Sequence, residues 1–281
     1  MSRFLSKASE SLLPYTPGEQ PQGRKFIKLN TNECPYPPSP KVAEAILAGY
    51  EEIAAGCGTA GAAGRAEKAD CGCDAGATEA GKMAEKVAQI MPPELANLRL
   101  YSDPEERVLI EAIAAHYRVG TNQVIAGNGS DEILGFAFRA FCDSEAPLQL
   151  ADLTYGFYPA LCGLYGIPFR VVPLEEDFTL NIEPYKNCGN NVIIANPNAP
   201  TGMNLPLSAI EEVAASNPDR VVMVDEAYVD FGGESCVSLL PKYENLVIIQ
   251  TFSKSRSLAG ARVGFAIANP ELIADMNRIK Y

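Results

Sequence analysis

The chain has 281 residues, of which 47% are hydrophobic and 21% charged, with a formal net charge of −12. This length and composition predict one large domain or two modest ones with an ordinary buried core. The acidic balance argues against nucleic acids and anionic membranes as partners, because either would require a basic patch.

The sequence also bears on the compartment of the protein and on metal binding. No stretch is long and apolar enough for a transmembrane helix, and the first ten residues lack the apolar core of a signal peptide. Eight cysteines are scattered along the chain, so we expect reduced thiols and a cytoplasmic location. The spacing of Cys57, Cys71 and Cys73 is not that of a zinc site, and the single histidine, His116, lies far from them. No metal site is predicted.

The first hundred residues are irregular. Residues 1–40 are rich in proline and predict an extended arm. Helical spacing follows from 41 to about 54, and returns at 83–91. Between them, residues 56–82 are mostly Gly, Ala, Cys and small polar groups, which bury little apolar area and predict a mobile segment.

From residue 101 onward, apolar runs alternate with helical patterns. Strands are expected at 123–126, 148–151, 169–173, 192–195, 220–224, 246–249 and 263–268, and helices at 105–117, 131–141, 157–165, 208–215 and 270–281. This alternation predicts an α/β fold, a three-layer αβα sandwich around a mainly parallel sheet. In such sheets ligands bind beyond the carboxyl ends of the strands. Gly127, Asn196, Asp225 and Thr251 each follow a predicted strand, so we expect a site there.

Lys254 lies in a hydroxyl-rich turn after a buried strand. Burial would favour its neutral, nucleophilic amine. The hydroxyls of Thr251 and Ser253 and the guanidinium of Arg262 would suit a phosphate group. A lysine beside a phosphate cradle favours pyridoxal phosphate, bound to Lys254 as a Schiff base. A surface Ser-Lys-Ser loop is the alternative reading of this turn by itself.

Further candidates follow the other strands. The turn containing Gly129, Ser130 and Asp131 could bring backbone N–H groups to an anion at a helix N-terminus, although a plain tight turn has the same pattern. Asp225 could pair with a pyridinium nitrogen. The ring oxygen could accept hydrogen bonds from Asn198 and Tyr228, and Tyr155 could stack on the ring; ordinary packing is the alternative for each tyrosine.

Three segments together carry a family resemblance: Asn-Pro-Asn-Ala-Pro-Thr-Gly at 196–202, Val-Asp-Glu-Ala-Tyr-Val-Asp-Phe at 224–231, and Thr-Phe-Ser-Lys-Ser-Arg-Ser-Leu-Ala-Gly-Ala-Arg-Val-Gly at 251–264. They resemble the fold-type I pyridoxal-phosphate aminotransferases of class II, and among these the histidinol-phosphate aminotransferases. Segments 29–33, 98–104 and 127–132 add to the resemblance, which spans the chain except about 56–90.

The resemblance implies a role for each candidate. Lys254 would bind the cofactor and shuttle protons, and the catalytic group would also include Asp225 and Tyr228. Cofactor contacts are implied for Gly129, Ser130, Asp131, Tyr155, Asn198, Asp225, Tyr228, Thr251, Ser253, Lys254 and Arg262, and for Tyr101 reaching the phosphate in another subunit of a homodimer. Substrate contacts are implied for Tyr15, Asn32 and Asn198.

It also implies a domain division. Residues 1–100 would form an arm and helix with an inserted flexible segment at about 56–90, and residues 101–269 the large cofactor-binding domain. Residues 270–281 would begin a C-terminal domain that is largely absent, because the family pattern continues past residue 281. The chain is therefore expected to be truncated.

The implied reaction interconverts histidinol phosphate plus 2-oxoglutarate with imidazole-acetol phosphate plus glutamate, in histidine biosynthesis. Its substrates would be small molecules. A lyase resembling threonine-phosphate decarboxylase would use the same core residues, and an inactive truncated fragment is the non-enzymatic alternative.

Overall fold

The structure is a computed structural model that describes residues 2–9, 41 and 101–280. Most of these belong to one compact unit, Met1–Thr16 with Glu106–Tyr281. A second unit, Pro17–Glu105, contributes only Lys41 and residues 101–105 to the description. The expected arm, the helices at 41–54 and 83–91 and the segment at 56–90 lie outside the described residues, apart from residues at their edges.

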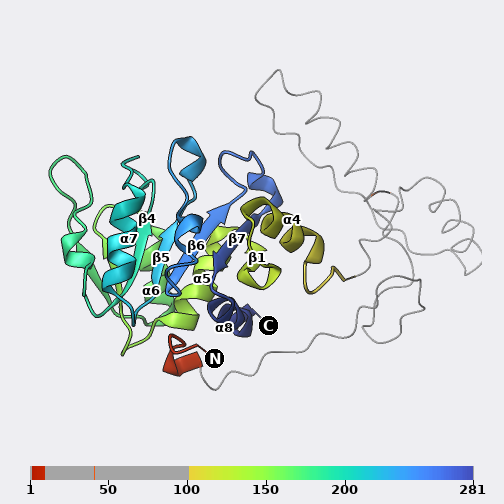
Figure 1. Ribbon diagram of the computed structural model, residues 1–281, viewed down its shortest axis with the longest axis horizontal. Helices are drawn as coiled ribbons and strands as arrows, with labels where there is room; N and C mark the ends of the chain where they lie inside the picture. Colours follow the sequence, from red (N-terminus) through yellow and green to blue (C-terminus); the bar gives the residue numbers. More distant parts are fainter. Residues whose placement is uncertain (1, 10–40, 42–100, 281) are drawn as a thin grey trace, which may run out of the picture. The chain divides into compact units, whose positions relative to one another are not determined.

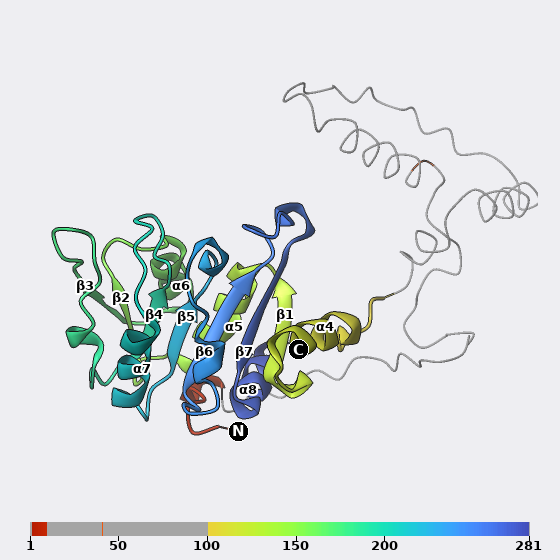
Figure 2. The ribbon, with the colours of Figure 1, turned by 45° about the horizontal axis from the view of Figure 1, so that its top comes forward.

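The described part of the large unit is built on one seven-stranded sheet in the order β1-β7-β6-β5-β4-β2-β3. The strands are β1 (Val124–Asn128), β2 (Leu148–Ala151), β3 (Phe169–Val172), β4 (Asn191–Ala195), β5 (Val222–Asp225), β6 (Leu246–Thr251) and β7 (Val263–Ala268). Figure 2 shows them side by side, from β3 at the left to β1 at the right. Pairing is parallel except that β7 runs antiparallel to both β1 and β6. The carboxyl ends of the other strands therefore share one edge.

Helices cover both faces of this sheet (Figure 1). One face carries α5 (Ser130–Phe141), α6 (Phe157–Tyr165) and α8 (Pro270–Lys280); the other carries α4 (Arg107–Tyr117) and α7 (Leu207–Ser216). Short 3-10 helices are η1 (Lys7–Ser9), η3 (Thr121–Gln123), η4 (Glu183–Tyr185), η5 (Val229–Phe231), η6 (Cys236–Leu239) and η7 (Ala259–Ala261). The predicted three-layer α/β class is confirmed.

Alternation within the strands divides the core into two layers. Met223 packs with the layer of α5 and α6, whereas its neighbours Val222 and Val224 pack with the layer of α4 and α7. Successive side chains of a strand point to opposite faces, so a strand covered on both sides must be apolar throughout. This explains why the central strands read as continuous apolar runs.

The N-terminal segment at residues 2–9 is hydrogen-bonded to both α5 and α8. The backbone N–H of Ser6 donates to Ala140 O at 2.6 Å, and Ser2 N donates to the buried carboxylate of Asp275 in α8 at 2.9 Å. Helix α8 thus belongs to the same unit as the sheet. The division of the chain at residues 100 and 269 stays a prediction.

Within the described residues, no helix has the length and apolar character needed to cross a bilayer. That part of the chain also holds no cluster of three or more His, Cys, Asp or Glu side chains suited to a metal ion.

Candidate active site

A cavity of about 100 Å³ opens at the carboxyl edge of the sheet. Its wall contains many of the residues singled out from the sequence: Ser130, Asp131, Tyr155, Asp225, Tyr228, Thr251, Ser253, Lys254 and Arg262. These residues come from segments after β1, β2, β5 and β6 and from the turn before β7. The expected convergence of strand ends is therefore present in the fold.

One side of the cavity is the N-terminus of α5. Gly129 precedes the helix with φ of 84°, a left-handed conformation that favours glycine. No side chain caps the helix there, so the first-turn N–H groups of Ser130 and Asp131 lack the usual capping acceptor. Such a terminus is a receptor for an anion, because donors and the positive end of the helix dipole coincide.

Gly264 in β7 allows this turn to pack tightly. A Cβ atom at this position would lie 2.2 Å from Ser130 N and 2.3 Å from Gly129 C. Neither neighbour is the end of a flexible side chain, so a substitution would displace the backbone. Gly264 therefore sets how closely the helix terminus approaches the sheet.

Arg262 supplies a positive charge at the same end of the cavity. Its side chain is 49% exposed and its Nη2 lies 3.9 Å from Asp131 Oδ2. The guanidinium lies over Gly129, where an added Cβ would stand 2.6 Å from Nη2. The absence of a side chain at residue 129 thus makes room for Arg262.

Asp225 lies at the end of β5 and is only 4% exposed. Burial raises the pKa of its carboxyl, while hydrogen bonds from Tyr158 and the N–H of Ala227 oppose that increase. Tyr158 Oη donates to Oδ2 at 2.7 Å, and Ala227 N donates to Oδ1 at 3.1 Å. The carboxylate is thereby held in one orientation at the cavity wall.

The sequence interpretation missed Tyr158, which also lines the cavity. A signal was present: Tyr158 follows Tyr155 by three residues, and this spacing places both on one side of a helical turn. Their rings meet edge to face, with centroids 5.5 Å apart. A buried aspartate needs a donor, and Tyr158 is a hydroxyl donor on the helix predicted at 157–165.

Tyr155 is oriented by a carboxylate. Its hydroxyl donates to Asp131 Oδ1 at 3.0 Å. Burial, followed by the hydrogen bond to Asp131 and the charge of that residue, raises the pKa of Tyr155 to about 12. Tyr155 therefore remains a protonated donor at neutral pH. The side chain of Asp131 faces Tyr155 and Arg262, while its backbone belongs to the helix terminus.

Lys254 differs from one expectation. Its side chain is exposed on the cavity wall rather than buried, because it lies three residues beyond the end of β6, where the chain has left the sheet. Its Nζ stands 5.3 Å from the ring centroid of Tyr228. The expected burial was wrong, but the amine lies on the same cavity as Asp225.

Asn198 is not among the cavity-lining residues, although its neighbours Pro197 and Ala199 are. It is 6% exposed, and its Nδ2 donates to Leu153 O and Thr201 Oγ1, both at 3.0 Å. Its Oδ1 accepts from Thr154. These bonds fix the loop after β4. The proposed contact of Asn198 with a ring oxygen stays a prediction.

The three remaining candidates have no described position relative to the cavity. Tyr15 and Asn32 lie outside the described residues. Tyr101 is described, but it belongs to the second unit. Their roles stay predictions.

Comparison with known proteins identifies the class. The family described as aminotransferase class I and II matches residues 78–281. The chain belongs to this family, which confirms the resemblance seen in the sequence. Its relatives include proteins named for one particular reaction: a histidinol-phosphate aminotransferase of Pseudomonas putida (strain W619) is 45% identical over 280 residues, covering 100% of this chain and 68% of the relative.

Solved structures agree with this assignment. A putative histidinol-phosphate aminotransferase from Erwinia carotovora atroseptica SCRI1043 has a TM-score of 0.60 and 32% identity, covering 64% of this chain and 55% of that one. A histidinol-phosphate aminotransferase from Sinorhizobium meliloti, solved in complex with pyridoxal-5'-phosphate, has a TM-score of 0.56 at 23% identity, covering 64% of this chain and 56% of that one. The latter shows a shared fold. The matched part of this chain covers little more than half the length of each of these solved proteins.

Proposed function

We propose that the chain binds pyridoxal phosphate in this cavity and interconverts histidinol phosphate plus 2-oxoglutarate with imidazole-acetol phosphate plus glutamate. One observation carries the proposal. A single cavity brings together an exposed amine, a buried carboxylate and a helix N-terminus without a side-chain cap, on Lys254, Asp225 and α5 respectively.

The residues fit the cofactor at its phosphate end. A phosphate dianion needs several N–H or O–H donors and a compensating charge. The first turn of α5 offers backbone donors without a side-chain cap. Thr251, Ser253 and Arg262 line the same cavity and add hydroxyls and a guanidinium. These groups would hold the phosphate.

The residues also fit the ring. Asp225 is a buried acid that a pyridinium N–H would satisfy, and Tyr158 already fixes its orientation. Tyr155 supplies an aromatic wall whose tilt is set by Asp131, and Tyr228 lines the cavity beside Lys254. These side chains would orient the ring and keep its nitrogen protonated.

When bound, the cofactor supplies an aldehyde for the amine and a ring that accepts electrons from the reacting carbon. Lys254 would move the proton, because its Nζ amine lies on the cavity wall and can both accept and donate one. Asp225 would face the ring nitrogen and stabilise its protonated form. The rings of Tyr155 and Tyr228 line the cavity beside the amine and would flank the bound cofactor.

The choice of substrates is supported by the names of relatives at 45% identity, together with the motifs at 196–202, 224–231 and 251–264. We also propose a homodimer, supported by the resemblance of Tyr101 to a residue that completes a partner's site. A cytoplasmic location is supported by the free thiols of Cys142, Cys162, Cys188 and Cys236. Light scattering should then report twice the mass of one chain.

The first experiment loads the chain with pyridoxal phosphate, reduces it with borohydride and maps the modified peptide by mass spectrometry. We expect the label on Lys254 and none in Lys254→Ala. The control Lys242→Ala, which removes a surface lysine paired with Glu211, should label like the wild type. Labelling elsewhere, or none, rejects the proposed cofactor site.

The second experiment measures the reaction. Glutamate formation from histidinol phosphate and 2-oxoglutarate is assayed beside decarboxylation of phosphothreonine. Glutamate formation that is lost in Lys254→Ala supports the proposal. Decarboxylation in its place favours a lyase, and labelling without any turnover identifies an inactive fragment.

A further inference from the structure

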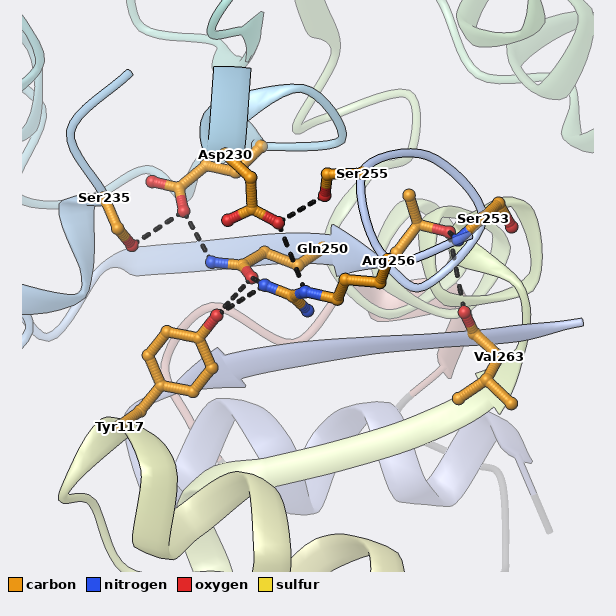
Figure 3. A network of polar contacts seen from close by, with 10 residues as sticks. Tyr117, Asp230, Ser235, Gln250, Ser253, Ser255, Arg256 and Val263 are labelled. Atoms are coloured by element: carbon orange, nitrogen blue, oxygen red, sulfur yellow. Dashed lines mark hydrogen bonds and ion pairs between the residues drawn. The ribbon is translucent and has the colours of Figure 1, made fainter. Parts of the chain in front are cut away.

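A polar network lies beside the Lys254 turn, on the face of the sheet covered by α4 (Figure 3). Gln250 in β6 is 1% exposed and is not part of the cavity wall. Because side chains alternate along a strand, Gln250 points away from the face that carries Ile249. The network is therefore separate from the groups that line the cavity.

Arg256 is the centre of this network. Its Nη2 donates to Tyr117 Oη and to Gln250 Oε1, each at 2.8 Å. Its Nε lies 3.2 Å from Asp230 Oδ2. The guanidinium also lies 5.2 and 5.5 Å from the ring centroids of Phe252 and Phe265. With 22% of its side chain exposed, Arg256 is held by acceptors and by aromatic faces at once.

The network continues into the segment after β5. Gln250 Nε2 donates to Glu226 Oε2 at 2.8 Å, and Ser235 Oγ donates to the same oxygen at 2.7 Å. Cys236 N donates to Glu226 Oε1 at 2.6 Å. A buried carboxylate with three donors is well satisfied. Glu226 therefore fixes the segment that begins directly after Asp225.

The network joins two turns that each carry cavity residues. Asp230, which follows Tyr228 by two residues, also accepts a 2.5 Å hydrogen bond from Ser255 Oγ. Arg256 follows Lys254 by two residues. Both turns are thus tied together immediately behind the side chains that face the cavity. Displacement of one turn would change the position of the amine relative to the acid.

We propose that Arg256 is a positioning residue, which acts through Asp230 and Gln250 to hold the Lys254 turn against the turn that follows Asp225. The proposal rests on the proposed function for its catalytic consequence. Arginine suits this position because its planar fork serves several acceptors while stacking on rings, which a lysine ammonium does not do. Arg256 does not touch the cavity.

The experiment compares Arg256→Met, Arg256→Lys, Asp230→Asn and the double variant of Arg256→Met with Asp230→Asn against the wild type. Arg3→Met is the matched control, since Arg3 forms an exposed ion pair with Glu244. Hydrogen exchange of cofactor-free protein is followed by mass spectrometry for residues 252–258 and, as an internal reference, for helix α7. Transamination supplies kcat and KM.

In Arg256→Met, exchange at 252–258 should accelerate by about tenfold or more, while α7 remains within about twofold of the wild type. A misplaced amine should lower kcat by about tenfold to a hundredfold, with a much smaller change in KM. Arg256→Lys should give an exchange rate at 252–258 and a kcat that lie between those of Arg256→Met and the wild type. In the double variant, Asp230→Asn should add little to the effect of Arg256→Met. Arg3→Met should match the wild type.

The outcomes separate this proposal from the proposed function. If the wild type shows no transamination, exchange in cofactor-free protein still decides whether Arg256 holds the turn. Unchanged exchange at 252–258 in Arg256→Met overturns the proposal. Equal acceleration in α7 also overturns it, because Arg256 would then stabilise the whole fold rather than the turn. Normal kcat in a loosened but active variant removes the catalytic consequence.

Discussion

Tyr158 Oη donates a 2.7 Å hydrogen bond to Asp225 Oδ2, and the two residues lie 67 positions apart in the chain. Both side chains are buried. An ionised carboxylate removed from water is costly unless donors replace the lost hydration. The pair therefore lets an acid reside at the end of a central strand, facing a cavity. It joins α6 to β5 at the point where the proposed cofactor ring would bind.

Replacing Tyr158 with phenylalanine tests this relationship. The variant keeps the ring and loses the donor, so we expect the pKa of Asp225 to rise further and the free energy of unfolding at neutral pH to fall by about 1.5–3 kcal/mol. Chemical denaturation measures the change. The control Tyr243→Phe removes a more exposed bond to Glu211 and should change stability by less than about 0.5 kcal/mol. Equal effects in both variants would refute the assigned role of Tyr158.

Asp225→Asn should make the cofactor-free protein more stable at pH 7 while abolishing transamination. Burial raises the pKa of Asp225 above the ordinary value of 3.8, so the folded state binds this proton more tightly than the unfolded state. That contribution to stability is complete below pH 3.8 and is lost as pH rises through the folded-state pKa. The amide in Asp225→Asn has no charge to bury, so the stability of this variant does not fall for this reason as the pH rises.

Denaturation curves from pH 4 to pH 8 follow this difference. The gap between Asp225→Asn and the wild type should widen with pH and close toward pH 3.8. Asp219→Asn, which alters a strongly exposed carboxylate, should run parallel to the wild type. A variant less stable than the wild type at pH 7 would show that the hydrogen bonds of Asp225 outweigh its burial.

The sequence predicted most of the fold between residues 101 and 280 because its patterns have clear ends. The helix expected at 157–165 is α6 (Phe157–Tyr165), and it ends at Gly166, which has φ of 67°. The helix expected from residue 105 begins instead at Arg107, because Glu106 is left-handed. Pro104 and the acids beside it suggested the earlier start. Only the backbone conformation shows that the first helical turn begins after Glu106.

The site was predictable where chemistry lies in contiguous motifs and unpredictable where it depends on distant pairs. Lys254 and Asp225 stood out because each follows an apolar run. Tyr158 and Arg256 did not, because their partners are remote: Arg256 meets Tyr117 across 139 positions. Strand order decides such pairings, and one sequence does not specify that order.

Gly264→Ala should disrupt the end of the cavity at which the phosphate is proposed to bind. The added Cβ would meet Ser130 N at 2.2 Å, so β7 or the first turn of α5 must move, at a cost of about 1–3 kcal/mol or more. We expect lower stability and weaker binding of inorganic phosphate, measured by denaturation and calorimetry. Gly163→Ala in α6 meets nothing within 4 Å and should stabilise the helix by about 0.5–1 kcal/mol. Wild-type phosphate affinity in Gly264→Ala would contradict this account.

Arg262→Gln should separate recognition of the phosphate from recognition of the ring. Loss of a charged hydrogen bond costs about 1.5–3 kcal/mol, which corresponds to a decrease of about tenfold to a hundredfold in affinity for pyridoxal phosphate. Affinity for pyridoxal, which has no phosphate, should be nearly unchanged. Fluorescence titration measures both ligands, with Arg170→Gln on the exposed edge strand β3 as control. Equal losses for both ligands would place Arg262 elsewhere than at the phosphate.

Asp131→Asn should lower the pKa of Tyr155 from about 12 toward the ordinary value of 10.0. The variant removes the negative charge and weakens the acceptor of the Tyr155 hydroxyl, whereas burial, the largest cause of the shift, remains. The pKa should therefore fall without reaching 10.0. Carbon NMR of ring-labelled tyrosine follows the titration, and Tyr155→Phe assigns the signal. Asp177→Asn alters an exposed carboxylate that bonds Thr179 and should leave the signal unchanged. An unchanged Tyr155 titration in Asp131→Asn would contradict this account. The 3.0 Å hydrogen bond between Tyr155 and Asp131 would then not determine the pKa of the hydroxyl, and another group would have to orient the Tyr155 ring.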